Sequence, residues 1–91
     1  MIWTVVVAKV AQKQLGRLPA KDQNRVSAAL RAMAGDPLSG DVLKLEGQKN
    51  KWRCRVGSYR IFFTIDANTK MVAVSAIVRR TSTRIRIKER R

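Results

Sequence analysis

Four cations within ten residues are the part of this sequence best suited to chemistry. In the stretch KWRCRVGSYRIFF, Lys51, Arg53 and Arg55 occupy alternate positions. Arg60 follows after a short break. Guanidinium and ammonium groups bind phosphate oxygens, and they stabilise the negative charge that develops when a phosphoryl group reacts. The spacing therefore indicates a phosphate-binding surface, provided that the fold brings these side chains together.

Two β-strands must position these cations. β-Branched and aromatic residues predict strands at 51–56 and 59–66, and the two-residue connection between them begins with glycine, as a type II′ hairpin turn requires. Strand side chains alternate between the two faces of a sheet, so the lysine and the arginines point one way and Trp52, Cys54 and Val56 point the other. The hairpin therefore has one basic face and one apolar face.

The short turn also sets which residues lie opposite each other across the hairpin. The predicted pairs on the basic face are Lys51 with Thr64, Arg53 with Phe62, and Arg55 with Arg60. A pair of like charges is unfavourable by a few tenths to about 1 kcal/mol. Two interpretations are open: the cations solubilise an exposed face, or the face binds phosphate and Phe62 offers a stacking surface for a base. We favour the second, because a polyanion would relieve the repulsion.

The remaining elements predict an α+β protein with the order β-α-α-β-β-β. Residues 2–8 are almost all β-branched or aromatic, which is typical of a central strand buried on both faces. Apolar residues at helical spacing predict helices at 9–17 and 19–35. Residues 36–50 predict a loop, and residues 71–79 predict the last strand. We expect an antiparallel-rich sheet of about four strands with a helical hairpin packed on one face.

Charge is the most unusual feature of the composition. The chain has 91 residues, of which 20 are Lys or Arg and 6 are Asp or Glu, so its formal net charge is +14. Fourteen of the cations fall in residues 44–91 with three acids. The length and the 45% apolar fraction predict one folded domain. A field of this sign attracts polyanions, so nucleic acid, an anionic membrane surface or an acidic protein are the partners to consider.

Several functional classes are excluded by residues that the chain lacks. One cysteine, Cys54, cannot form an internal disulfide, and no apolar run approaches the ~20 residues that cross a bilayer. The apolar start has no basic region before it, so we expect no signal peptide, no membrane partner and a cytoplasmic location. The chain has no histidine, which excludes a histidine acid–base pair, and its scattered acids predict no metal site and no cofactor.

Three segments, KLEG, KWRCRVGSYRIFFTID and AIVRR, together resemble the RelE/ParE superfamily of toxins from type II toxin–antitoxin modules. The resemblance extends over residues 2–86, and its most specific part is the hairpin pattern R-x-G-x-Y-R-hydrophobic-x-[YF]. It implies a single RelE-like domain at residues 1–80 and a basic C-terminal tail at residues 81–91. It also implies one of two activities, because the RelE branch cleaves messenger RNA on the ribosome and the ParE branch inhibits DNA gyrase.

The resemblance also assigns residues. By position, its catalytic residues are Lys51, Arg53, Arg60 and Arg80. Further RNA contacts are implied at four arginines, namely Arg55, Arg79, Arg84 and Arg86. Spacing leaves open whether Arg79 or Arg80 shares the face of the hairpin cations, and the family alignment favours Arg80. Many relatives have a tyrosine near the C-terminus where this chain has TSTRIRIK, and arginine cannot replace a tyrosine as an aromatic surface or proton donor.

For an endoribonuclease without histidine or metal, the remaining mechanism is attack by the 2′-hydroxyl of the RNA on the adjacent phosphorus. The arginines would stabilise the phosphorane, and Lys51 is the candidate proton carrier. We expect the ribosome and mRNA as partners, together with an acidic antitoxin of the RelB kind. Two other functions stay open: a ParE-like gyrase inhibitor, and a basic nucleic-acid-binding domain without catalysis.

Overall fold

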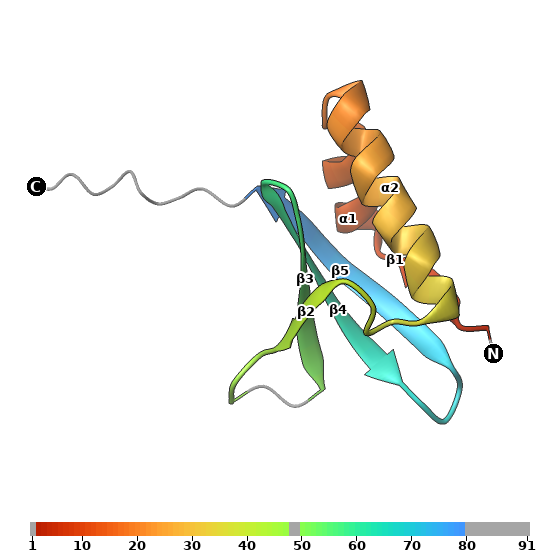
Figure 1. The fold of residues 1–91 in the computed structure, drawn as a ribbon. Helices are drawn as coiled ribbons and strands as arrows, with labels where there is room; N and C mark the ends of the chain where they lie inside the picture. Colours follow the sequence, from red (N-terminus) through yellow and green to blue (C-terminus); the bar gives the residue numbers. More distant parts are fainter. Residues whose placement is uncertain (1, 48–49, 80–91) are drawn as a thin grey trace, which may run out of the picture.

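The computed structural model describes residues 2–47 and 50–79 and shows two helices and a five-stranded sheet. The elements in chain order are β1 (Thr4–Val7), α1 (Lys9–Gly16), α2 (Ala20–Gly35), β2 (Asp41–Lys44), β3 (Lys51–Val56), β4 (Tyr59–Asp66) and β5 (Met71–Arg79). Both helices lie on the same side of the sheet (Figure 1). The predicted α+β class and the helical hairpin on one face are therefore confirmed.

The strands are arranged in the order β1-β5-β4-β3-β2. β1 pairs with β5 in parallel, and the other three neighbouring pairs are antiparallel. The parallel pair requires a crossover, and the two helices between β1 and β2 lie above it (Figure 1). The described residues form two layers, with the helices over β1 and β5, and no described element covers the opposite face of the sheet.

The predicted central position of the first strand is wrong, because β1 is an edge strand. Thr4 and Val6 are exposed, and the side chain of Val6 is 43% exposed, whereas Val5 and Val7 pack against the core. A run of β-branched residues predicts a strand but does not determine its place in a sheet. Here one face of β1 lies under the helices, and the other belongs to the uncovered side.

The prediction of a loop throughout residues 36–50 is also wrong in part. Asp41–Lys44 forms β2, which pairs with β3 and makes the sheet one strand larger than expected. This strand has four residues, begins with Asp41 and ends with Lys44, so it has little apolar alternation. Short, charged strands are common at sheet edges because they discourage pairing with other chains.

The helices begin and end as proline and glycine predict. α1 ends at Gly16, and Pro19 is the N-cap of α2 with a φ of −56°, close to the value that the proline ring imposes. Along α2, Val26, Leu30 and Met33 recur at helical spacing and are buried. None of the described helices is long and apolar enough to span a membrane.

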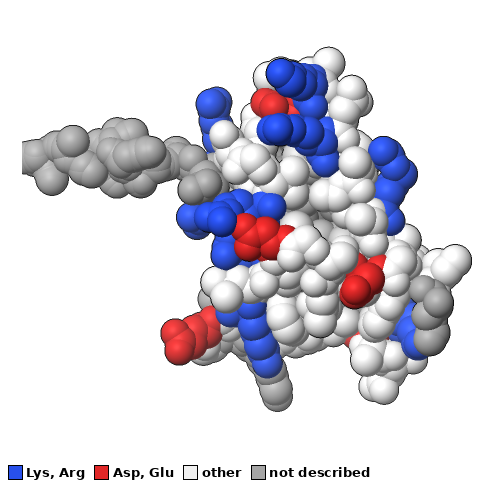
Figure 2. All heavy atoms as spheres, in the orientation of Figure 1, with Lys and Arg blue, Asp and Glu red and all other residues white. Residues whose placement is uncertain are grey.

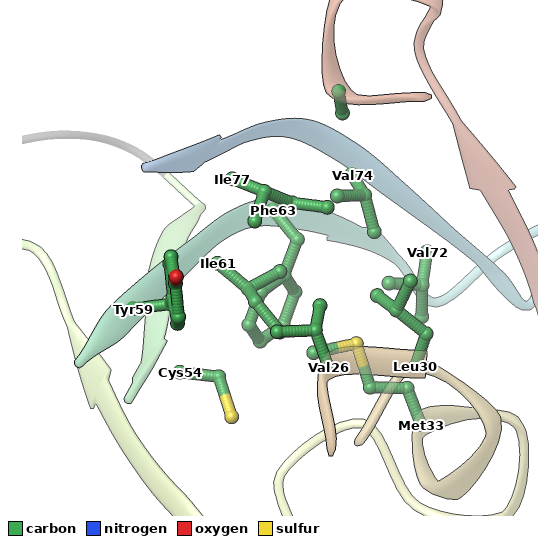
Figure 3. Close-up of a cluster of buried hydrophobic side chains, with 11 residues drawn as sticks. Val26, Leu30, Met33, Cys54, Tyr59, Ile61, Phe63, Val72, Val74 and Ile77 are labelled. Atoms are coloured by element: carbon green, nitrogen blue, oxygen red, sulfur yellow. The ribbon is translucent and has the colours of Figure 1, made fainter. Parts of the chain in front are cut away.

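The core lies between α2 and the helix side of the sheet. Figure 3 shows side chains of α2 pointing toward buried residues of β4 and β5, among them Ile61, Phe63, Val72, Val74 and Ile77. From β3, Cys54 is buried, and Trp52 and Val56 pack against the same cluster, as the alternation predicted. Burial raises the pKa of the Cys54 thiol, so this side chain packs as a small apolar group.

Candidate functional site

The side of the sheet that faces away from the helices carries the four predicted cations. The observed pairs are Lys51 with Thr64, Arg53 with Phe62, and Arg55 with Arg60, so the predicted register is confirmed. We call this set of side chains, Lys51, Arg53, Arg55 and Arg60, the basic face. Like charges lie directly opposite each other in one of its pairs, where the Cβ atoms of facing residues are about 4.5–5.5 Å apart.

The hairpin turn that creates this register is the one that its glycine predicted. Gly57 has a φ of +57°, and Ser58 does not have a positive φ, which is the pattern of a type II′ turn. A Cβ atom at position 57 would lie 2.8 Å from Nη1 of Arg25, so the guanidinium of this α2 residue occupies the space beside the turn. The backbone conformation therefore favours glycine here, whereas the Arg25 guanidinium is the end of a flexible, exposed side chain and can move aside.

One arginine of the basic face is paired within the protein. Arg55 Nε donates to Asp41 Oδ2 at 2.7 Å, and both side chains are about half exposed. Asp41 lies on β2, directly opposite Arg55. Sequence reasoning missed this carboxylate because it placed residue 41 in a loop. Arg55 is therefore partly neutralised, and its predicted role in RNA binding has less support than those of the other three cations.

Lys51, Arg53 and Arg60 form no ion pair with any residue that the structure describes. Lys51 and Arg60 are exposed, whereas Arg53 is partly buried between its cross-strand neighbours Leu43 and Phe62. Such neighbours cover the methylene stem of an arginine and restrict its conformation, while the guanidinium stays in water. These three residues present positive charge on two adjacent strands without a described ion pair. Of the three, Arg53 has the side chain whose conformation is most restricted by its neighbours.

Arg79 does not belong to the basic face. It lies opposite Tyr59, whose side chain is on the helix side of the sheet, and opposite residues of an antiparallel pair point to the same face. The register shifts between Phe62 and Phe63, beside Ser75, whose Oγ donates to the carbonyl of Phe62 at 3.2 Å. Spacing alone could not detect this irregularity. The predicted RNA contact of Arg79 therefore cannot be made from the face of the other cations.

Three other predicted arginines lie outside the described residues: Arg80, Arg84 and Arg86. The predicted basic tail at 81–91 lies outside them as well, so these assignments stay predictions. In the described part of the chain, no three side chains of His, Cys, Asp or Glu come together in a group that could hold a metal ion.

A hydrogen bond between α2 and β4 anchors the strand that carries Arg60. The hydroxyl of Tyr59 donates to Asp22 Oδ2 at 2.9 Å, and the tyrosine side chain is only 6% exposed. This hydrogen bond to the carboxylate, followed by burial, raises the pKa of Tyr59. Tyr59 therefore packs in the core with its hydroxyl at the rim, as expected, but nothing in the local sequence identified Asp22 as its partner.

Basic charge is not confined to the sheet. Figure 2 shows Lys and Arg side chains over the helical hairpin as well as beside the sheet, with few carboxylates between them. Six of the cations lie in the first 43 residues, on or next to the two helices. The basic face is therefore one part of a broadly cationic surface, and it differs from the rest in having its charges aligned on adjacent strands.

The fold is that of solved RelE toxins. RelE in an archaeal RelE–RelB complex from Pyrococcus horikoshii OT3 is similar with a TM-score of 0.81 and 25% identity, over 91% of this chain and 100% of that chain. The RelBE2 complex of Mycobacterium tuberculosis matches with a TM-score of 0.78 and 22% identity, over 88% and 100%. Isolated RelE of E. coli matches with a TM-score of 0.78 and 14% identity, over 91% and 89%.

These similarities and the basic hairpin define a toxin of the RelE/ParE superfamily. The sequence profile described as "ParE toxin of type II toxin-antitoxin system, parDE" matches residues 5–83. The chain therefore belongs to the ParE toxin family of type II toxin–antitoxin systems, and the superfamily predicted from its hairpin motif is confirmed. No curated protein has a sequence that matches this chain.

Proposed function

We propose that this toxin is an endoribonuclease that cleaves messenger RNA on the ribosome through the cations of its basic face. The observation that carries the proposal is the position of Lys51, Arg53 and Arg60 on one side of adjacent strands, without an ion pair among the described residues. Phe62 lies among them and is partly exposed, so a base can stack beside the bound phosphate.

The proposed chemistry needs only charge stabilisation and proton transfer. The 2′-oxygen of the RNA bonds to the adjacent phosphorus, the bond from phosphorus to the 5′-oxygen breaks, and a 2′,3′-cyclic phosphate and a 5′-hydroxyl remain. Arg53 and Arg60, together with Arg80, stabilise the charge of the phosphorane. A preorganised donor of this kind contributes about 3–4 kcal/mol to the transition state.

Lys51 carries the proton in this proposal. The attacking hydroxyl loses a proton and the leaving 5′-oxygen gains one, and an arginine does not give up its proton in a protein. Lys51 is the one lysine of the basic face, and it is exposed at the start of β3. Lys51 lies opposite Thr64 at one end of the basic face, and this position supports contact with the leaving group.

We propose that cleavage depends on the ribosome, because the basic face has few side chains that can act as a general acid or base. Holding the 2′-oxygen in line with the scissile bond is worth up to about 7–11 kcal/mol. The basic face is an open sheet surface rather than a deep cleft, so it supplies charge but little constraint on a flexible RNA. We propose that the ribosome provides that constraint and that free RNA is a poor substrate.

A cognate antitoxin is the second proposed partner. RelE toxins from Pyrococcus horikoshii and Methanococcus jannaschii are seen in complex with RelB antitoxins. With a net charge of +14, this chain would attract an acidic partner strongly. We propose an acidic antitoxin that covers the basic face and excludes RNA from it.

Inhibition of DNA gyrase is the alternative, and one observation favours it. The matching family profile is that of ParE, the branch to which gyrase inhibition belongs, and the similar solved structures are those of RelE. A gyrase inhibitor acts by binding, so it does not need unpaired cations at one phosphate. The alignment of Lys51, Arg53 and Arg60 is the reason that we favour mRNA cleavage over gyrase inhibition.

The two functions are separated by testing purified toxin in parallel assays. Messages in a reconstituted translation reaction are mapped for cut sites and for the chemistry of their ends, with and without ribosomes. Supercoiling by gyrase is measured with the same protein. The proposal predicts cuts with 5′-hydroxyl ends only when ribosomes are present, and unchanged supercoiling. Intact messages together with blocked supercoiling would establish the alternative.

A further inference from the structure

A hollow of about 590 Å³ opens beside Lys51, on the same side of the sheet as the basic face. Its lining includes Thr64, which lies opposite Lys51 on β4, and Ala73, which lies opposite Thr64 on β5. Met71 and Asp66, another facing pair, also line it, next to the turn between β4 and β5. Its volume is within the range of about 300–1,000 Å³ that is typical of ligand pockets.

Two side chains of the lining, Asp66 and Asn50, are each held in place by hydrogen bonds, and each keeps one oxygen that accepts no hydrogen bond from a described residue. Asp66 Oδ1 accepts from the backbone N–H groups of Asn68 at 3.0 Å and Thr69 at 3.4 Å, which leaves Asp66 Oδ2 without a partner among the described residues. The side-chain amide of Asn50 donates to the carbonyl of Ile65, which leaves its own oxygen available in the same way. Local hydrogen bonds therefore orient both groups before a ligand arrives.

Asp66 differs from Asp41, the other acid on this side of the described sheet. Asp41, the other carboxylate on this side of the sheet, is paired with Arg55, but Asp66 forms no ion pair with any described residue. A free carboxylate next to a phosphate-binding lysine repels an RNA backbone, so it does not serve general affinity for RNA. It can contribute to selectivity instead, because a carboxylate accepts hydrogen bonds and donates none.

We propose that this hollow binds a nucleobase that carries an exocyclic amino group and that it disfavours uracil. The inference rests on the proposed function, because it places the phosphate of the same nucleotide on Lys51. Asp66 and Asn50 offer acceptors to the amino group, as Asp does for the N4 amino group of cytosine. Met71 and Ala73 provide apolar contact for the ring. Uracil presents a carbonyl oxygen where cytosine presents that amino group, so it faces the carboxylate with like partial charge.

The test compares two ligands of the same size by nuclear magnetic resonance of the full chain. Cytidine 5′-monophosphate and uridine 5′-monophosphate differ mainly in the group at C4 of the base. We expect cytidine monophosphate to shift the signals of Thr64, Met71 and Ala73, and to bind about tenfold more tightly than uridine monophosphate, as a good base contact requires. Equal affinities, or shifts that avoid these three residues, would overturn the assignment.

Asp66→Asn sharpens the test without removing the local structure. An asparagine oxygen can accept the same two backbone N–H groups, while its amide nitrogen becomes a donor where Asp66 Oδ2 was an acceptor. The variant should reverse the preference toward uridine monophosphate. Asp36→Asn is the matched control, because Asp36 Oδ1 also accepts a backbone N–H two residues on, from Leu38 at 3.0 Å, outside the hollow. This control should keep the preference for cytidine monophosphate.

Cleavage maps distinguish failure of this inference from failure of the proposed function. If the wild-type toxin cuts messages, uracil should be under-represented at one fixed position beside the cut, and Asp66→Asn should remove that bias while cutting continues. If messages stay intact but the nucleotide preference is seen, the hollow is a base site and the nuclease proposal fails. If cutting occurs and neither the bias nor the nucleotide preference is found, the nuclease proposal stands and the hollow is not a base site.

Discussion

The two faces of the β3–β4 hairpin obey different physical requirements although they belong to the same fourteen residues of two strands. On the helix side, Cys54 lies opposite Ile61, and both are buried in the core. On the other side, Arg55 lies opposite Arg60, and the two like charges repel each other. The ion pair of Arg55 with Asp41 offsets part of this repulsion. Alternation along the strands thus separates the residues that stabilise the fold from those that we propose act on RNA. Substitutions at neighbouring positions should separate stability from activity.

The largest effect on stability is expected at Phe63, which is 1% exposed in the centre of the core (Figure 3). Phe63→Ala should lower the free energy of unfolding by about 3–5 kcal/mol, because the cavity cannot be filled by its neighbours. Phe62→Ala is the matched variant on the opposite face, and it should lower that free energy by much less. Urea denaturation followed by circular dichroism measures both. Equal losses would show that the two faces do not differ in the way described.

The next largest effect is expected on activity alone. Arg60→Gln should reduce the rate of mRNA cleavage by about 100- to 1,000-fold, because a donor to the phosphorane is lost. The same variant should keep or slightly raise the free energy of unfolding, by up to about 1 kcal/mol, because a like-charge pair is removed. Arg31→Gln on the exposed side of α2 is the control, and it should leave the cleavage rate unchanged. A loss of activity that tracked unfolding would contradict the comparison.

A smaller effect on stability is expected at the turn that joins the two strands. Gly57→Ala should lower the free energy of unfolding by about 1–2 kcal/mol, because alanine is strained at a φ of +57°. The added Cβ would also lie 2.8 Å from Arg25 Nη1. The same substitution in an Arg25→Ala background measures the backbone contribution by itself. If Gly57→Ala left the free energy of unfolding unchanged in both backgrounds, the type II′ turn would be ruled out as the element that sets the register.

The smallest expected effect is on the pH dependence of the free energy of unfolding, and it comes from Tyr59 on the helix side of the sheet. The hydrogen bond to Asp22 raises the pKa of Tyr59 above its ordinary value of about 10, so the folded state holds the phenol proton more tightly than the unfolded state does. The resulting stabilisation is present below the unfolded pKa and is lost as the pH rises through the folded pKa. The free energy of unfolding should therefore fall as the pH rises above about 10. Tyr59→Phe should show a shallower fall, and an identical slope would contradict this assignment.

The hairpin was the part of the fold that could be predicted from the sequence in most detail. Residues 51–56 and 59–66 alternate clearly, and a two-residue turn that begins with glycine permits only one register between them. The helices were predictable for a similar reason, because Pro19 and Gly35 mark their ends and Val26 and its neighbours recur at helical spacing. In both cases the structure is determined by residues close together in the chain.

The errors have a common cause, which is dependence on distant segments. β2 has four residues and little apolar alternation, so neither the strand nor the pairing of Asp41 with Arg55 could be predicted. The edge position of β1 depends on its pairing with β5, a strand more than sixty residues later. For the same reason, spacing left open whether Arg79 or Arg80 shares the face of the hairpin cations, since that face depends on a register shift between β4 and β5. None of these features leaves a local pattern in the sequence.

The most direct test of the account is the cleavage rate of Lys51→Ala on ribosome-bound message, measured under single-turnover conditions beside the wild-type toxin. Lys51 is exposed and contributes nothing to the core, so the variant should fold normally. If the basic face is a catalytic surface with Lys51 as its proton carrier, cleavage should fall by about 100-fold or more. Cleavage at the wild-type rate would contradict that assignment, and it would leave the aligned cations of this face without their proposed chemical role.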